Sequence, residues 1–562
     1  MDKKNIILLF IIAVLAVFLR FGYFGVSPPS LNWDEVSHGY NAYSILKTGE
    51  DQWGQKFPIF NFRAYGDYPT TLNLYLTIPF ILFFGLSDFA IRFPHALMGV
   101  LTVISVYFAA YGVFKRKDLS LATSLLVATG PWYIFTSRFV LQANISIFLL
   151  SGALALFLNK SKNKYFLPVS FLLLFASLFS YHTTRIFSPL LLLGVLVIYS
   201  KEVFSFLRDR KILGMFYGFV IFSFFVFTGL IFQNPDSRAR SEVLSIINQG
   251  AVNKIESLRN TSNYPATIKK LIYNKPVYFV SVFSKNYIEY FSPEFLFFKG
   301  GTQYQFSLPN HGLLFPFNIP FFYIGLLVVV VKAINDKNYR VLLLWILLAP
   351  IPASLTNEHF AVVRATTFLP IPEMLISIGA WEIFKKINFK YVSYLATCYL
   401  ILLFVFLELY MTSYLSTYPK EYSWSWQYGY KQVSSFVLEN YDKYDKVVMT
   451  KKYGEPHEFL LYYLKWDPQK YIEDKTAVRF NKSSWYWVDR FDKFNFVNDW
   501  QVVDSLGTNK VFIQESRNIV DCSTIRCLLI TSPNNSPKGW KLINKVSFLD
   551  GKPAFELYEN KI

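Results

Sequence analysis

Two adjacent carboxylates, Asp34 and Glu35, follow the first apolar stretch of the chain, directly after Asn32-Trp33. A carboxylate pair at the mouth of an apolar segment is costly to hold near hydrocarbon unless it binds a cation or takes up a proton. We therefore interpret Asp34, with Glu35 beside it, as a candidate general base or metal ligand. The alternative is that Asp34 caps the helix-forming residues after it, since Asp is a favoured N-cap residue.

A second acidic side chain lies in the same polar segment, within the run Gly66-Asp67-Tyr68-Pro69. These residue types favour a turn. If the turn brings Asp67 close to Asp34, the two carboxylates offer oxygen ligands for a divalent cation. Asp67 and Tyr68 are thus candidates for the lining of a cavity, and Asp34 with Asp67 for a metal site.

Arg138, Gln142 and Asn144 follow Gly130-Pro131-Trp132 at the junction of two apolar stretches. On a helix they fall on nearly one face, and three polar groups on one face at membrane depth indicate a cavity. The alternative for Arg138 is that its guanidinium extends to the membrane interface.

Two further segments combine His with Arg, one through His182 and Arg185 and the other through His359 and Arg364. Arginine stays charged and offers two parallel donors, so these side chains are candidates for binding a phosphate or pyrophosphate. For His182 and Arg185 the alternative is an interfacial anchor of aromatic and cationic residues. Because all four polar clusters are predicted on one side of the apolar segments, a shared cavity explains them best.

The elements that must position these residues are predicted to be membrane spans. The chain has 562 residues, of which 53% are hydrophobic and 17% charged, with a mean hydropathy of +0.29. This composition excludes a disordered or disulfide-scaffold protein and makes a water-exposed surface hard to build. A membrane helix needs about 20 mostly apolar residues, and by this rule we expect about eleven spans. They lie near 5–25, 90–114, 119–137, 140–158, 165–181, 186–200, 212–232, 313–331, 341–355, 366–384 and 391–412.

Two more apolar runs, 72–86 and 277–298, are interrupted by proline or charged residues. We expect them to be interfacial or re-entrant helices.

The distribution of charge predicts the orientation of the chain. Six short segments that follow every second span hold 18 Lys and Arg against five acids, a net +13 out of the total +18. They are residues 1–4, 115–118, 159–164, 201–211, 332–340 and 385–390. By the positive-inside rule, we expect these segments and the N-terminus to be cytoplasmic and the four polar clusters to face outward. The first span is then expected to be an uncleaved anchor and not a signal peptide. Because topology accounts for most of the positive charge, nucleic acid is excluded as a partner.

The residues from about 413 onward differ in character, with Lys and Asp interspersed among short apolar runs. Helical periodicity covers 427–441 and 457–466, whereas 446–449, 510–513 and 527–531 read as short buried strands. The stretch 540–558 alternates around Asp550-Gly551 and predicts a hairpin. We expect two domains, a membrane domain at 1–412 and an extracytoplasmic α/β domain at 413–562.

Two features of the second domain leave alternatives open. Cys522 and Cys527 lie five positions apart, which is compatible with a disulfide in an oxidising compartment or with two buried small residues. There are two interpretations of the aromatic run Trp485-Tyr486-Trp487. These side chains stack on sugar rings, or they pack in the core of the domain.

The spacing of these motifs resembles that of the membrane glycosyltransferases of the GT-C superfamily, specifically bacterial relatives of the protein O-mannosyltransferases (glycosyltransferase family 39) and of the aminoarabinose transferase. The resemblance covers about 1–412. It is carried by Asp34-Glu35, Gly66-Asp67-Tyr68-Pro69, Gly130-Pro131-Trp132 with Ser137-Arg138 and Asn144, Tyr181-His182 with Arg185, His311-Gly312-Leu313-Leu314-Phe315-Pro316, and Pro350-Ile351-Pro352-Ala353 with His359 and Arg364.

The resemblance implies a mainly α, polytopic GT-C bundle in the cytoplasmic (inner) membrane that transfers a sugar from a polyprenyl-phosphate donor to a hydroxyl acceptor on the outer face. Asp34 would be the base, and Arg185 and Arg364, supported by Arg138, His182 and His359, would neutralise the lipid phosphate. The acceptor could be protein, lipid or glycan.

The chain departs from the family pattern at one place. The region after the first Asp reads Asp67-Tyr68-Pro69 and not the His-Pro pair of many members, which leaves dependence on Mg²⁺ or Mn²⁺ open. No other cofactor is implied.

Two rival functions remain. A transporter or flippase of lipid-linked sugar would distribute polar residues through the bilayer to both faces, whereas here they concentrate at one. A polysaccharide polymerase or ligase would also transfer a sugar, but from a donor linked through pyrophosphate.

Overall fold

The computed structural model describes residues 2–218, 221, 245–482, 485–504 and 509–561. The chain divides into two compact units. The helical unit comprises Met1–Gly22 and His95–Met411, and the mixed unit comprises Tyr23–Pro94 and Thr412–Ile562. This division groups the first polar loop with the C-terminal residues. The domains expected at 1–412 and 413–562 stay a prediction.

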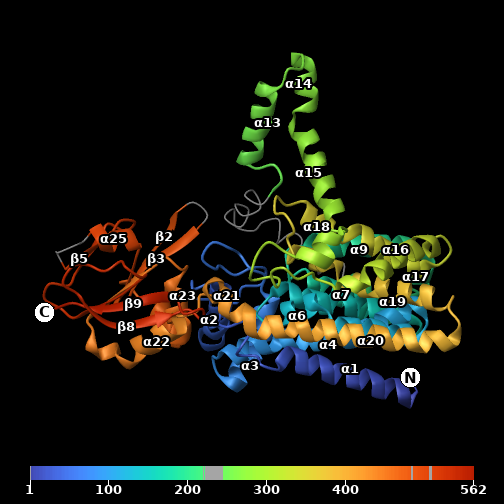
Figure 1. The fold of residues 1–562 in the computed structure, drawn as a ribbon, viewed down its shortest axis with the longest axis horizontal. Helices are drawn as coiled ribbons and strands as arrows, with labels where there is room; N and C mark the ends of the chain where they lie inside the picture. The colour runs from blue at the N-terminus through green and yellow to red at the C-terminus, as the bar shows by residue number, and fades with distance from the viewer. Residues whose placement is uncertain (1, 219–220, 222–244, 483–484, 505–508, 562) are drawn as a thin grey trace. The chain divides into compact units, whose positions relative to one another are not determined.

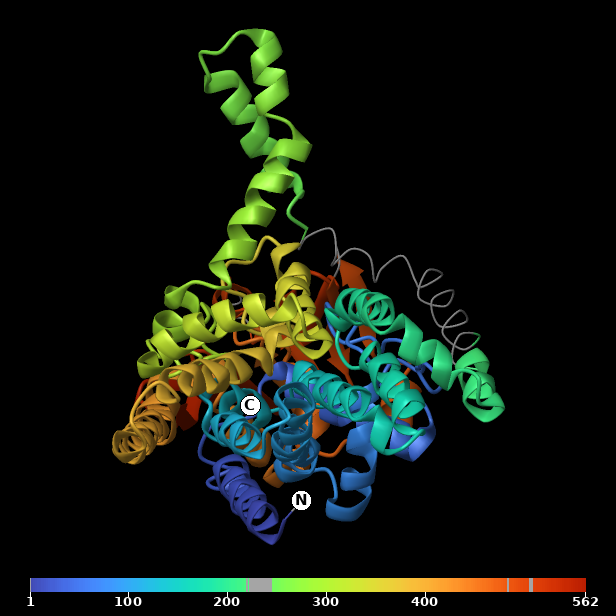
Figure 2. The same cartoon turned by 90° about the vertical axis from the view of Figure 1, so that its right-hand side faces the viewer.

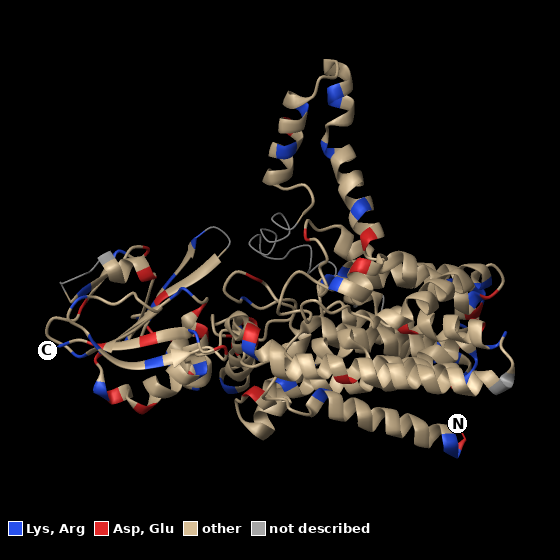
Figure 3. Ribbon diagram, in the orientation of Figure 1, with Lys and Arg blue, Asp and Glu red and all other residues tan. Residues whose placement is uncertain are grey.

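The helical unit is built mainly from apolar helices, which Figures 1 and 2 draw as coiled ribbons. They are α1 Lys3–Phe21, most of α4 Asp88–Phe114, α5 Lys117–Thr129, α6 Pro131–Ser137, α7 Gln142–Leu158, α8 Phe166–Ser177, α9 Thr184–Ile198, α10 Ser200–Phe206, α16 Ile319–Ala333, α17 Lys337–Leu348, α18 Ile351–Ser354, α19 Ile371–Phe384 and α20 Phe389–Thr412. Lys, Arg, Asp and Glu gather near the ends of α1 and α20 and leave long uncharged stretches between (Figure 3).

Among the described residues, four helical stretches are long and apolar enough to cross a membrane, or up to six if each bent pair counts as one span. The four are Lys3–Phe21, Asp88–Phe114, Pro316–Ala333 and Tyr391–Trp426. The bent pairs are α5 with α6, at 53°, and α9 with α10, at 91°.

The expected number of eleven spans is therefore not confirmed. Helices α7, α8, α17 and α19 coincide with expected spans but have 12 to 17 residues, fewer than the roughly 20 that a membrane crossing requires. Most of the expected span 212–232 lies outside the described residues.

Helices α16 and α19 approach each other through glycine. A Cβ atom on Gly325 would lie 1.9 Å from the carbonyl oxygen of Leu375, and one on Gly379 would lie 1.9 Å from that of Phe321. Small residues of this kind let two apolar helices come into backbone contact.

A helical arm projects from the helical unit (Figures 1 and 2). It consists of α13 Gln249–Thr261, α14 Ala266–Ile272 and α15 Lys275–Glu289, and a π-helical turn at Glu294–Lys299 follows it. The expected interfacial run 277–298 falls on α15 and this turn. Asn248 and Asn274 start α13 and α15 by accepting hydrogen bonds from the backbone amides of Ala251 and Val277.

The mixed unit contains a seven-stranded sheet with the strand order β2-β3-β4-β1-β7-β9-β8. The strands are β1 Lys446–Thr450, β2 Val478–Lys482, β3 Trp485–Phe491, β4 Phe494–Val497, β7 Cys527–Thr531, β8 Lys541–Ser547 and β9 Pro553–Glu559. β1 runs parallel to β4 and β7, and the other neighbours are antiparallel. A second sheet pairs β5 Lys510–Ile513 with β6 Asn518–Asp521.

The helices of the mixed unit come from both ends of the chain. They are α2 Trp33–Thr48 and α3 Leu72–Phe84 from the first loop, and α21 Tyr418–Tyr422, α22 Tyr430–Glu439, α23 Pro456–Tyr463, α24 Pro468–Ile472 and α25 Asp499–Asp504 from the C-terminal part. The predicted strands at 446–449, 510–513 and 527–531 are confirmed, as is the hairpin at 540–558, whose Gly551 has a φ of 86°. Strands β2, β3, β4 and β6 were not predicted.

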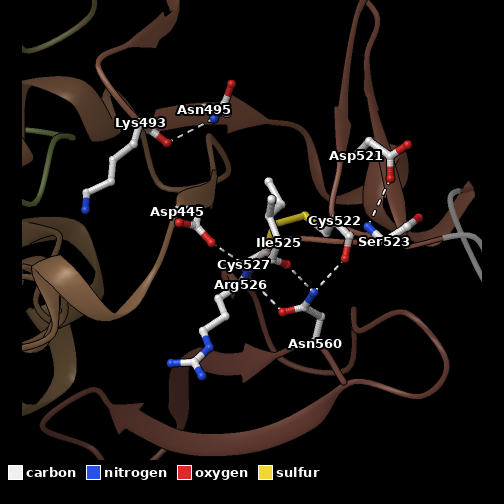
Figure 4. The surroundings of a disulfide bond; sticks show 10 residues. All are labelled: Asp445, Lys493, Asn495, Asp521, Cys522, Ser523, Ile525, Arg526, Cys527 and Asn560. Carbon is white, nitrogen blue, oxygen red and sulfur yellow. Dashed lines mark hydrogen bonds between the residues drawn. A yellow bond between two sulfur atoms is a disulfide. The ribbon is translucent and has the colours of Figure 1, made fainter. Parts of the chain in front are cut away.

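Cys522 and Cys527 form a disulfide in the core of the mixed unit (Figure 4). Asn560 forms three hydrogen bonds around the disulfide (Figure 4). Its side-chain nitrogen donates to the carbonyl oxygens of Cys522 at 2.6 Å and Ile525 at 2.8 Å. Its side-chain oxygen accepts from the backbone amide of Cys527 at 2.8 Å. Of the two alternatives at this pair, the structure therefore shows the disulfide.

Candidate functional site

The first acidic cluster lies in the first turn of α2. Asn32 is the N-cap: its side-chain oxygen accepts from the amide of Glu35 at 2.9 Å, while the Glu35 carboxylate accepts from the amide of Asn32 at 3.2 Å. This is a capping box, which satisfies two amides at a helix start. Asp34 is therefore not the cap of this helix.

Glu35 makes a buried ion pair with Arg92 of α4. The Arg92 Nε lies 2.8 Å from Glu35 Oε1 and the Nη2 lies 2.7 Å from Oε2, with side-chain exposures of 3% and 0%. Arg92 also donates to the carbonyl oxygen of Ser30 at 2.6 Å. Because both Glu35 oxygens are engaged, the geometry favours Asp34 over Glu35 as the reacting carboxylate, and a catalytic role for either stays a prediction.

Asp34 is exposed and accepts a hydrogen bond from the hydroxyl of Tyr65. The Tyr65 ring is buried between Trp33 and Trp485. Burial raises the pKa of Tyr65 well above its ordinary value, and Asp34 raises it further, so the hydroxyl keeps its proton and acts as a donor. The result is a solvent-accessible carboxylate held by a fixed donor.

Asp67 and Tyr68 lie in the expected turn. Asp67 accepts from the amide of Tyr68 at 2.7 Å, and the Tyr68 hydroxyl donates to that of Tyr486 at 3.2 Å. No group of three or more His, Cys, Asp or Glu side chains within the described ranges is arranged to hold a metal ion. The metal site expected at Asp34 and Asp67 stays a prediction.

In the helical unit, Arg138 is fully buried and is bonded to the end of α1. Its Nη1 donates to the carbonyl oxygens of Leu19 at 2.8 Å, Arg20 at 3.2 Å and Gly22 at 2.8 Å. Carbonyls at a helix C-terminus lack intrahelical partners, so this contact caps α1. It gives Arg138 a structural role, and phosphate binding by Arg138 stays a prediction.

Gln142 and Asn144 both belong to the first turn of α7. The amide of Asn144 donates to the carbonyl oxygen of His95 at 2.7 Å. This bond ties α7 to α4 and gives Asn144 a packing role in addition to the expected lining of a cavity.

The remaining cationic candidates lie in two turns of the helical unit. Arg364 forms a two-point ion pair with Glu358 at 2.8 and 3.0 Å, and 15% of its side chain is exposed. Tyr181, from the other turn, interacts electrostatically with both partners of this pair. The two turns are therefore neighbours.

Arg185 and His359 complete this group. The Nε of Arg185 donates to the carbonyl oxygen of Leu178 at 3.1 Å, and its Nη1 lies 3.3 Å from His182 Nδ1. His359 is half exposed, with its Nδ1 3.2 Å from Glu289 Oε2 at the end of α15. The contacts of Tyr181 make the two turns neighbours, and phosphate binding by His182, Arg185, His359 and Arg364 stays a prediction.

The candidate residues divide between the two units. Asp34, Glu35, Asp67 and Tyr68 belong to the mixed unit, whereas Arg138, Gln142, Asn144, His182, Arg185, His359 and Arg364 belong to the helical unit.

Several buried polar groups were missed from the sequence. They are Arg92; the pair Tyr133 and Glu373, joined at 3.0 Å; Arg20, bonded to the carbonyl oxygens of Val127 and Ala128; and the group Glu455, His457 and Glu458. For Arg92, Glu373 and Arg20, a charged residue inside an apolar run was the available signal.

No protein-family model matches the chain, and a search of curated proteins finds no match. Among solved structures, the oligosaccharyltransferase of Archaeoglobus fulgidus is 14% identical with a TM-score of 0.46, over 82% of this chain and 64% of that chain. ArnT from Cupriavidus metallidurans, bound to undecaprenyl phosphate, is 10% identical with a TM-score of 0.44, over 100% and 99%. The Saccharomyces cerevisiae protein O-mannosyltransferase Pmt1-Pmt2 complex, bound to the sugar donor, is 18% identical with a TM-score of 0.32, over 47% and 38%.

These solved structures come from the group of membrane glycosyltransferases that the sequence motifs resemble. This chain spans less than two thirds of the length of the Archaeoglobus enzyme.

Proposed function

We propose that this chain is an integral-membrane glycosyltransferase that moves a sugar from a polyprenyl-phosphate donor to a hydroxyl acceptor on the outer face of the membrane. The observation that carries the proposal is Asp34, an exposed carboxylate held by Tyr65 next to a buried ion pair. A carboxylate that is oriented and open to solvent is suited to act as a general base.

In the proposed reaction, Asp34 accepts the proton of the acceptor hydroxyl as its oxygen attacks the anomeric carbon. A bond forms between the acceptor oxygen and this carbon, and the bond from the carbon to the phosphate oxygen breaks. The electron pair leaves with the polyprenyl phosphate, whose developing negative charge a cationic side chain can neutralise. The sequence motifs make Arg364 and Arg185 the candidates for this role.

The proposed orientation places the N-terminus in the cytoplasm and the C-terminal residues outside. The charge of the six short segments supports it. The disulfide between Cys522 and Cys527 supports it independently, since disulfides persist in oxidising compartments.

The test is transfer by membranes that contain the Asp34→Asn variant, fed with a labelled polyprenyl-phosphate sugar and an acceptor extract. We expect transfer to fall by about 100-fold or more, because general-base catalysis contributes about 10²–10⁴-fold. Asp442→Asn, which changes an exposed aspartate elsewhere in the mixed unit, is the matched control and should transfer normally. Full activity of Asp34→Asn would remove Asp34 from the mechanism.

Parallel assays with other substrates separate the rival functions. Turnover of a polyprenyl-pyrophosphate glycan, but not of the phosphate-linked monosaccharide, would indicate a polymerase or ligase. Movement of the lipid-linked sugar across vesicles without transfer would indicate a flippase.

A further inference from the structure

Asp34 is linked to the C-terminal part of the chain through aromatic side chains. The Tyr65 ring, whose hydroxyl donates to Asp34, has its centroid 5.8 Å from that of Trp33 and 5.3 Å from that of Trp485. Trp485 is the first residue of β3, so the donor to Asp34 is packed against the seven-stranded sheet.

Two glycines make this packing close. A Cβ atom on Gly66 would lie 2.1 Å from the Trp485 ring, and one on Gly454, at a φ of +120°, would lie 2.3 Å from the Trp33 ring. In addition, the amide of Tyr486 donates to the carbonyl oxygen of Tyr65 at 2.5 Å. The first loop and β3 therefore hold each other in one arrangement within the mixed unit.

Trp485 is itself anchored by buried polar groups. Its Nε1 donates to Glu455 Oε1 at 2.6 Å, and the other oxygen of Glu455 lies 3.5 Å from His457 Nδ1. His457 Nε2 lies 3.4 Å from Glu458 Oε1, which also accepts from the side-chain amide of Gln52 at 2.6 Å. Because these groups are almost fully buried, they hold the tryptophan in one orientation.

We propose that Tyr65 is a positioning residue for Asp34, and that the C-terminal residues act on the reaction by fixing Tyr65 through Trp485 and Glu455. The inference rests on the proposed function. A hydrogen bond from a packed donor holds a carboxylate in one orientation and stabilises its charged form. The C-terminal residues then have a part in catalysis that does not require them to contact the acceptor.

The decisive variant is Tyr65→Phe, which keeps the ring and removes the hydroxyl. We expect kcat to fall by about 10- to 100-fold, the loss typical of an orienting partner, with an unchanged KM for the polyprenyl-phosphate sugar. The acid limb of the pH–rate profile should move to higher pH, because the ionised carboxylate loses a donor. Glu455 and Glu458, which interact electrostatically with Tyr65, and the Glu35–Arg92 pair are unchanged in the variant.

Tyr441→Phe is the matched control, because it removes a tyrosine hydroxyl that donates to Asp492 at 2.5 Å elsewhere in the mixed unit. It should leave kcat and the pH profile as in the parent protein. Trp485→Phe provides a second test if Tyr65→Phe does not fold: it removes the donor to Glu455 and should give a smaller loss of kcat with a pH shift in the same direction.

The results separate the inference from the proposed function. If the parent protein transfers sugar and Asp34→Asn does not, a Tyr65→Phe variant with the parent kcat and pH profile overturns the inference alone. A Trp485→Phe variant with parent kinetics overturns the part assigned to the C-terminal residues. If the parent protein transfers no sugar from the lipid phosphate, the proposed function itself fails.

Discussion

At the scale of residues, neighbouring carboxylates have different surroundings. Glu35 is buried against Arg92, whereas Asp34 is exposed and accepts a hydrogen bond from Tyr65. Two buried charges are tolerated only when each satisfies the other, so Glu35 and Arg92 depend on each other for burial. Asp34 lies outside this buried pair, and its exposed carboxylate is the one that the proposed reaction uses.

This difference predicts opposite outcomes for two adjacent substitutions. Glu35→Gln should lower the free energy of unfolding by about 3 kcal/mol, because Arg92 would stay buried without its carboxylate. Asp34→Asn should change it by about 0.5 kcal/mol or less, as is usual for exposed positions. Thermal unfolding of the purified variants in detergent measures both, and equal losses of stability would contradict the distinction.

At the scale of elements, the helical unit depends on close contact between its apolar helices. Between α16 and α19 the contact is backbone to backbone, at Gly325 and Gly379. Lipid offers no hydrophobic driving force for helix association, so close packing has to supply the attraction.

Gly325→Ala is therefore expected to destabilise the helical unit by about 1–3 kcal/mol, the range for an overpacked core. Its Cβ would overlap the backbone of α19, which cannot move aside as a flexible side chain would. Gly214→Ala is the control, because a Cβ atom at this helical glycine meets nothing within 4 Å. Melting temperatures and size-exclusion profiles should separate the two variants, and identical behaviour would argue against the packing role of Gly325.

At the scale of the whole molecule, the distribution of charge sets the expected topology. Net positive charge in six short segments predicts that they remain in the cytoplasm. All candidate site residues then face the outside, where a lipid-linked donor would be presented.

Cysteine labelling tests this orientation. In a Cys398→Ser background, Lys561→Cys should react with an impermeant maleimide in intact cells, whereas Lys162→Cys should react only after permeabilisation. Both lysines are exposed, and the disulfide keeps Cys522 and Cys527 from reacting. Labelling of Lys162→Cys in intact cells would reverse the topology.

Local patterns predicted much of the fold. Apolar runs located most of the helices, and alternation around Asp550-Gly551 located the final hairpin. Strands β2 and β4 were not predicted, because they have only five and four residues and depend on pairing with their neighbours in the sheet.

The sequence by itself determined which segments are apolar, in which short segments positive charge gathers, and which polar residues stand out between the apolar segments. These properties depend on composition and periodicity along the chain, so they can be read without knowing the fold. Only the tertiary structure decided that Asn32 caps α2, that Arg92, 57 positions away, neutralises Glu35, and that Tyr65 bonds to Asp34. Such pairings depend on which distant segments pack together, and no local pattern specifies that.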